Sequence, residues 1–86
     1  MTLTKHELQE KIKTELAIKT SNKDQARQLV ALLKGGGFGH WAIIWDDVKQ
    51  GSIFSFIGGK MVIDRDVKLF EDRKIILFKT LKIKEE

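Results

Sequence analysis

The spacing of apolar residues changes once along this chain, at the glycine-rich run over residues 35–39. Before the run, apolar side chains recur every three or four positions, which is the period of an amphipathic helix. After it they alternate or run continuously and are mostly β-branched or aromatic, which is typical of strands. The pattern predicts a single α+β domain over residues 1–86, with a helical part over about 3–34 and a sheet part over about 40–84.

The first predicted helix has a clear start signal. Thr4 can accept a hydrogen bond from the amide of Glu7, while the Glu7 carboxylate reaches back to the Thr4 amide, which is the arrangement of a capping box. Leu8, Ile12 and Leu16 then follow at four-residue spacing. A helix from Thr4 through Leu16 would therefore carry one apolar stripe toward the core.

A second helix is predicted to begin after Ser21 or Asn22, either of which can serve as its N-cap. Its apolar stripe consists of Ala26, Leu29, Val30 and Leu33. Gly35 suits the left-handed position that follows a helix, so the helix should end there. Residues 17–20 are expected to be a short connection between the two helices.

The second half predicts an antiparallel β-meander of three to five strands. The expected strands span about residues 40–46, 52–57, 60–64 and 75–83, with 67–70 as a further possible one. Gly58-Gly59 lies between two apolar runs and is a signal for a two-residue hairpin, because both positions of a type I′ turn need positive φ. Lys49-Gln50 is a weaker signal for the preceding turn.

With these two turns, the register sorts the sheet into two faces, neither of them polar. One face collects Trp41, Ile43, Trp45, Phe54, Phe56, Met61 and Ile63. The other collects Ala42, Ile44, Ile53, Ser55, Ile57 and Val62. Two short helices can cover one side only, and the bulky aromatic side is the better candidate because large rings fill the gap between helices and sheet.

The remaining aliphatic face is predicted to be a protein interface, either of a homodimer or for a protein target. Its candidate contact residues are Ala42, Ile44, Ile53, Ile57 and Val62. Two alternatives remain open. The C-terminal segment could fold across this face with Ile75, Leu77, Leu81 and Ile83, or the register could be shifted by one residue, which would exchange the faces.

Composition narrows the function classes. The 86 residues include no cysteine, so neither a disulfide nor a thiolate metal site is available, and we predict no cofactor and no metal. No segment approaches the roughly 20 apolar residues of a membrane span, and the N-terminus lacks the features of a signal peptide. We therefore expect no membrane association and a cytoplasmic location.

The net charge of +4 favours acidic partners. The basic residues of the second half are Lys60, Arg65, Lys68, Arg73, Lys74, Lys79, Lys82 and Lys84. They could bind the phosphates of DNA, RNA or a nucleoprotein, while Trp41 or Trp45 could stack on bases. Alternatively, lysines on an edge strand protect it from aggregation.

Enzymatic function has little support in the sequence. The glycine run follows a helix, whereas a phosphate-binding loop precedes one. Asp47 and the sequence Asp66-Val67-Lys68, with an acid such as Glu7, loosely resemble the layout of the PD-(D/E)xK metal-dependent nucleases. The chain has no proline before Asp47, however, and Asp64-Arg65-Asp66 is polar for a buried strand.

Three functions are thus predicted in order. The first is a small non-catalytic module that binds nucleic acid or nucleoprotein through the basic C-terminal strand and hairpin turns. The second is a protein-binding regulator or inhibitor, of the kind encoded by phages and mobile elements, that acts through the apolar sheet face. The third is a small metal-dependent nuclease.

Overall fold

The computed structural model describes residues 1–38 and 48–85 and confirms the α+β class. In chain order the elements are β1 (Thr2–Thr4), α1 (Lys5–Thr14), β2 (Leu16–Lys19), α2 (Lys23–Leu33), β3 (Ile53–Ile57), β4 (Lys60–Asp64), the 3₁₀ helix η2 (Val67–Phe70), β5 (Lys74–Leu77), the 3₁₀ helix η3 (Phe78–Thr80) and β6 (Lys82–Lys84). The strand predicted over residues 40–46 lies outside the described residues.

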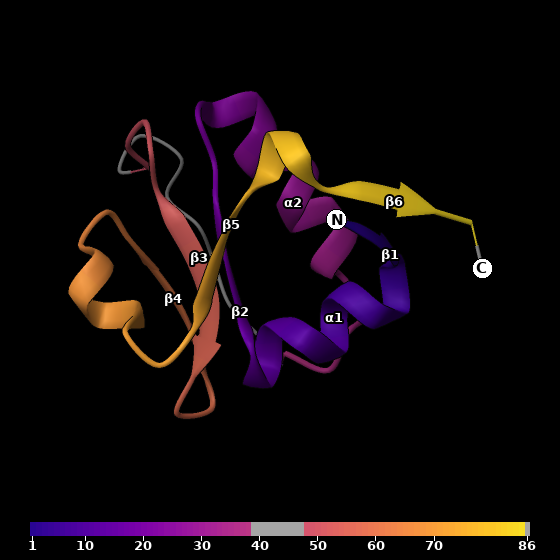
Figure 1. The fold of residues 1–86 in the computed structure, drawn as a ribbon, viewed down its shortest axis with the longest axis horizontal. Coiled ribbons are helices and arrows are strands. Elements are labelled where there is room, and N and C mark those ends of the chain that lie inside the picture. The colour runs from indigo at the N-terminus through magenta and orange to yellow at the C-terminus, as the bar shows by residue number, and fades with distance from the viewer. Residues whose placement is uncertain (39–47, 86) are drawn as a thin grey trace.

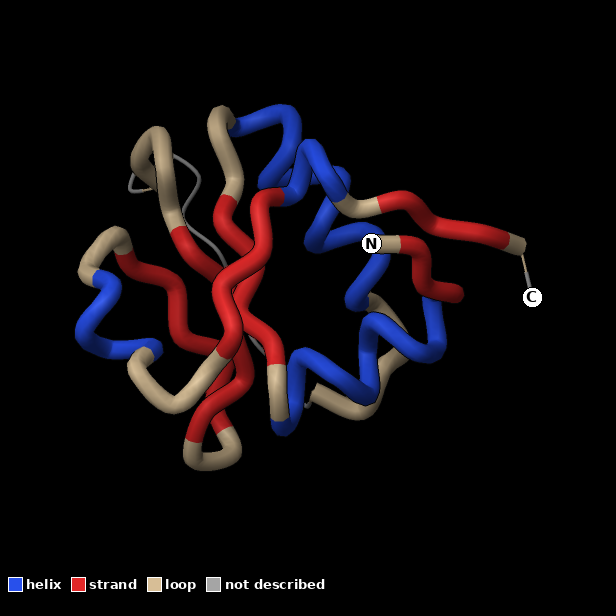
Figure 2. The backbone as a smooth tube through the Cα atoms, in the orientation of Figure 1, coloured by secondary structure: helices blue, strands red, loops and turns tan. Residues whose placement is uncertain are grey.

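The described strands form two sheets. One is four-stranded in the order β4-β3-β2-β5, and the other is a two-stranded ribbon of β1 and β6. Helices α1 and α2 cover one face of the four-stranded sheet, and η2 lies on the opposite face (Figure 1). The β1–β6 ribbon lies beyond the helices, away from the larger sheet (Figure 2). The helices are thus packed between the two sheets.

Helix α1 starts as predicted. The Thr4 hydroxyl accepts from the Glu7 amide at 3.1 Å, and the Glu7 carboxylate accepts from the Thr4 amide at 3.0 Å. The helix ends at Thr14, however, and residues 16–19 form strand β2. The prediction of Leu16 as a helical residue, and of residues 17–20 as a connection, was wrong.

The physical reason lies in the neighbours of β2. This strand pairs with β3 on one side and with β5 on the other, so it occupies the interior of the sheet. Leu16, Ala17 and Ile18 are all buried, which requires cover on both faces. In the sequence, this short apolar run follows the apolar stripe of α1 without a break. The pattern therefore does not show where the helix ends and the strand begins.

Helix α2 begins after Asn22, whose side chain accepts from the Gln25 amide at 2.9 Å. It ends in a tight turn in which the Gly36 amide donates to the Leu33 carbonyl at 3.2 Å. Lys34 has φ −61° and ψ 136°, and Gly35 has φ +80°, which are values typical of the two central positions of a type II turn. The prediction that Gly35 takes positive φ after the helix is confirmed.

The β3–β4 hairpin has the predicted register. Gly58 and Gly59 have φ of +60° and +79°, and Ile57 lies opposite Lys60. The preceding turn is displaced by one residue from the prediction. The Ser52 amide donates to the Lys49 carbonyl at 3.2 Å, which places Gln50 and Gly51 at its centre instead of Lys49 and Gln50.

The larger sheet is mixed and not a meander. Strand β2 is antiparallel to β3 but parallel to β5, so the chain order of the strands differs from their order in the sheet. The strand predicted over 75–83 is divided into β5, η3 and β6, and residues 67–70 form a 3₁₀ helix. Because β4 and β5 lie at opposite edges, the segment between them has to cross one face of the sheet.

The crossing segment adds a second hydrophobic cluster to the core, on the face of the sheet opposite the helices. The aromatic side of the sheet faces the helices as predicted: Phe54 is fully buried in one cluster with Leu8 and Leu29. On the other side, Phe70 of η2 is fully buried in a second cluster with Ala17 and Ile53. The described sheet is therefore covered by helices on one face and, in part, by η2 on the other.

Candidate functional site

An open apolar groove of about 480 Å³ lies between α2 and the C-terminal segment. It is lined by Gln28, Ala31 and Leu32 of α2, by Phe78 of η3, by Leu81 and by Ile83 of β6. We call it the α2–β6 groove. Leu32 belongs to α2 but lies outside its predicted inward stripe, so it is only partly buried against the core. The groove exists because η3 turns the chain away from the sheet and carries Leu81 and Ile83 past the side of α2 (Figure 1).

The β1–β6 ribbon has one apolar and one polar face. Leu3 pairs with Ile83 in the parallel register, and Leu3 is buried while Ile83 keeps 37% of its surface exposed. Because successive side chains in a strand point to opposite faces, Lys82 and Lys84 project to the other side of the ribbon. Ile83 thus lines the groove between two lysines that point away from it.

The chain from residue 74 to 84 contains four lysines and no acidic residue. Lys74, Lys79, Lys82 and Lys84 are all exposed, and none takes part in the ion pairs found within the described residues. Lys84 is followed in the chain by Glu85, and its charge also acts on Glu7 in the first turn of α1. The pKa of Glu7 is lowered mainly because its carboxylate accepts a hydrogen bond from the Thr4 amide, and the charge of Lys84 adds to the effect.

The other predicted nucleic-acid contacts do not join this stretch. Lys60 begins β4 at one edge of the four-stranded sheet, whereas Lys74 begins β5 at the opposite edge. Arg65 and Lys68 belong to the segment that crosses the face opposite the helices (Figure 1). The basic residues therefore do not form one continuous patch.

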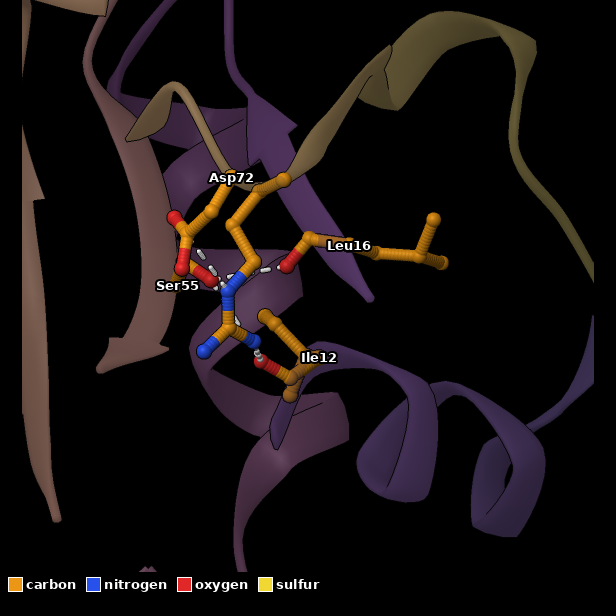
Figure 3. Close-up of polar contacts among 5 residues, drawn as sticks. Ile12, Leu16, Ser55 and Asp72 are labelled. Carbon is orange, nitrogen blue, oxygen red and sulfur yellow. Dashed lines mark hydrogen bonds and ion pairs between the residues drawn. The ribbon is translucent and has the colours of Figure 1, made fainter. Parts of the chain in front are cut away.

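Arg73 has a structural position. Its side chain is only 9% exposed, and one guanidinium nitrogen, Nη1, donates to the Ile12 carbonyl at 3.3 Å near the end of α1. The Ser55 hydroxyl donates to the Leu16 carbonyl at 2.7 Å in the same region (Figure 3). A cation at the carboxyl end of a helix is favourable. Arg73 thus helps to terminate α1, and little of its side chain is exposed for contact with nucleic acid.

The predicted protein interface is partly covered by the chain itself. Ile53 is fully buried beneath Phe70, and Ile57 and Val62 are partly buried against the same cluster. Ala42 and Ile44 lie outside the described residues. The cover comes from η2 and not from the C-terminal residues considered for it, since Ile75 and Leu77 remain 36% and 39% exposed.

One acid of the nuclease hypothesis, Asp66, caps a turn in this structure, as does the nearby Asp64. Asp64 accepts from the Asp66 amide at 3.0 Å, and Asp66 accepts from the Lys68 amide at 3.0 Å. Within residues 1–38 and 48–85, no three His, Cys, Asp or Glu side chains gather where they could hold a metal ion. Asp47 lies outside the described residues.

The α2–β6 groove was missed by the sequence reasoning. Two signals pointed to it: apolar residues at positions 31 and 32, beside the inward stripe of α2, and one isoleucine between two lysines near the C-terminus. Neither signal indicates that the two segments meet.

In the part of the chain that the structure describes, no helix is long and apolar enough to cross a bilayer.

Comparison of the chain with protein-family models, with curated proteins and with solved structures finds no match in any of the three.

Proposed function

We propose that this protein is a non-catalytic module that binds another protein through the α2–β6 groove. The observation that carries the proposal is a surface groove lined mainly by apolar side chains, among them Leu32, Phe78, Leu81 and Ile83. Exposed apolar patches and grooves mark binding sites for proteins, membranes or small ligands. The proposal keeps the predicted class of protein-binding regulator but moves the contact surface from the sheet to α2 and β6.

The lining of the groove argues for a peptide segment as the occupant. Among the described residues, Gln28 alone lines the groove with a polar side chain, and the groove is open. Sites for small polar ligands instead gather several converging polar groups in a deeper pocket. A groove beside a helix or strand suits a segment that contributes apolar side chains at regular spacing. Shape and chemistry together favour a protein partner.

Filling the groove tests the proposal. Ala31 is exposed on α2, so Ala31→Trp should occupy the groove without disturbing the core, while Lys23→Trp places the same side chain on α2 outside the groove. Peptides selected from a random displayed library on the unmodified protein should bind Ala31→Trp at least ~10-fold more weakly and Lys23→Trp equally well, as measured by fluorescence anisotropy. Circular dichroism checks that both variants are folded.

Two results would contradict this function. One is a set of selected peptides that bind Ala31→Trp as tightly as the unmodified protein. The other is a library from which no peptide is enriched.

The second candidate is binding of DNA or RNA, which the run of four exposed lysines between residues 74 and 84 favours. Such binding depends on counterion release, so it should weaken steeply with salt and with Lys79→Glu. Absence of binding to a single-stranded oligonucleotide at low salt would eliminate it.

Self-association as a homodimer also stays a prediction, and light scattering measures it directly.

A further inference from the structure

We propose that β6 accepts an extended segment of the partner protein as an added strand, and that this segment carries one apolar residue between two acidic ones. The inference rests on the proposed function, because it specifies the partner of the α2–β6 groove. Three features of β6 support it: an unpaired backbone edge, an apolar face toward the groove and a basic face away from it.

The backbone edge follows from the hydrogen bonds of the ribbon. The Lys82 amide donates to the Met1 carbonyl at 2.8 Å, so Lys82 directs its backbone groups toward β1. In a parallel ladder the next residue directs its groups the other way. The amide and carbonyl of Ile83 therefore point away from β1 and have no partner among the described residues. Figure 1 shows β6 extending beyond the helices, where this edge can be reached.

The side chains of an added strand would follow the alternation of β6. A residue directly opposite Ile83 projects to the same face of the sheet and would enter the groove beside Leu81. Its two neighbours project to the other face, beside Lys82 and Lys84. One apolar residue flanked by two polar ones thus matches β6 in either strand direction.

The charges of Lys82 and Lys84 favour acidic residues on either side of the apolar residue in the partner segment. Lys82 and Lys84 are exposed and take part in none of the ion pairs within the described residues. Opposite charges on facing positions of two strands stabilise their pairing. A second copy of this chain fits less well, because two antiparallel β6 strands centred on Ile83 would place Lys82 opposite Lys84 of the other copy. Nucleic acid supplies no backbone amides for the strand edge.

A short synthetic peptide, Ser-Glu-Ile-Glu-Ser, tests the charge requirement. It should bind the unmodified protein at least ~10-fold more tightly than Ser-Lys-Ile-Lys-Ser does. In a variant with Lys82→Glu and Lys84→Glu, this preference should reverse. Lys79→Glu reverses one lysine charge outside β6, half the change of the double variant, and should leave the preference unchanged. A preference that is absent, or that survives the double substitution, would overturn the inference.

Backbone methylation tests the strand geometry. In antiparallel pairing the peptide isoleucine amide bonds to Ile83, and in parallel pairing the amide of the following glutamate does so. N-methylation of one of these two positions should weaken binding at least ~10-fold, and the other should have little effect. Bound peptide should also slow hydrogen exchange at the Ile83 amide.

These results separate the two proposals. If library-selected peptides bind in the groove but leave the exchange of Ile83 unchanged, the groove function stands and the added strand is wrong. If filling the groove with Ala31→Trp has no effect on any peptide, the proposed function fails as well.

Discussion

At the scale of single residues, Phe70 has the largest effect on which surfaces are available. It is fully buried over Ala17 and Ile53, and it covers part of a predicted interface. The neighbouring Leu69 is 49% exposed. Two adjacent apolar residues in one 3₁₀ helix therefore have opposite roles, because only one of them points to the sheet.

Phe70→Ala should lower the free energy of unfolding by about 3–5 kcal/mol, since it removes a buried ring and leaves a cavity against the sheet. Leu69→Ala is the matched control and should cost less than about 1 kcal/mol, as expected for an exposed side chain. Urea denaturation followed by circular dichroism measures both. Similar losses for the two variants would mean that η2 does not cover the sheet as described.

At the scale of elements, the β3–β4 hairpin shows how local chemistry sets the pairing of neighbouring strands. Gly58 and Gly59 both have positive φ, and the register that follows places Phe56 opposite Met61 on the helix side. Both residues are partly buried against the main core. A substitution that alters the turn would therefore shift the strand register and disturb the packing of these two side chains.

Gly59→Val should destabilise the protein by about 1–3 kcal/mol, because a β-branched residue is strained at positive φ. Gly58→Asn should change stability by less than about 0.5 kcal/mol, since asparagine followed by glycine is a favoured pair in type I′ turns. Thermal or urea denaturation tests this contrast. Equal stability of the two variants would be inconsistent with the observed turn.

At the scale of the whole molecule, the two sheets differ in how firmly they are held. Strand β2 is paired on both sides and largely buried, whereas β6 pairs, among the described strands, with β1 alone and is exposed along its length. Regions with few buried contacts open more easily than the core of a domain. The proposed binding strand thus lies in the less stable part of the fold, where a partner can add to it.

Native-state hydrogen exchange should show this difference. The Ile18 amide in β2 should exchange only through global unfolding, while the Lys82 amide in β6 should exchange much faster through local opening. The Lys82 rate divided by the Ile18 rate should fall toward one as denaturant is added, because both amides then exchange through global unfolding. Equal protection of both amides in water would contradict the proposed mobility of the ribbon.

The sequence by itself determined the features that depend on neighbours along the chain. The capping box of α1, the N-cap of α2, positive φ at Gly35 and the Gly58-Gly59 hairpin all rest on contacts within a few residues, so residue type and spacing predict them. The sorting of β3 and β4 into two faces follows from the same turn.

Only the tertiary structure decided what each segment pairs with. Residues 16–18 are apolar in a way that fits the end of a helix or a central strand, and the presence of β3 and β5 on both sides makes them a strand. Phe70 reaches the aliphatic face because β4 and β5 lie at opposite edges. The groove likewise joins α2 to a segment that is distant in sequence. Such contacts depend on packing between distant segments, and a local pattern carries no information about which of them will meet.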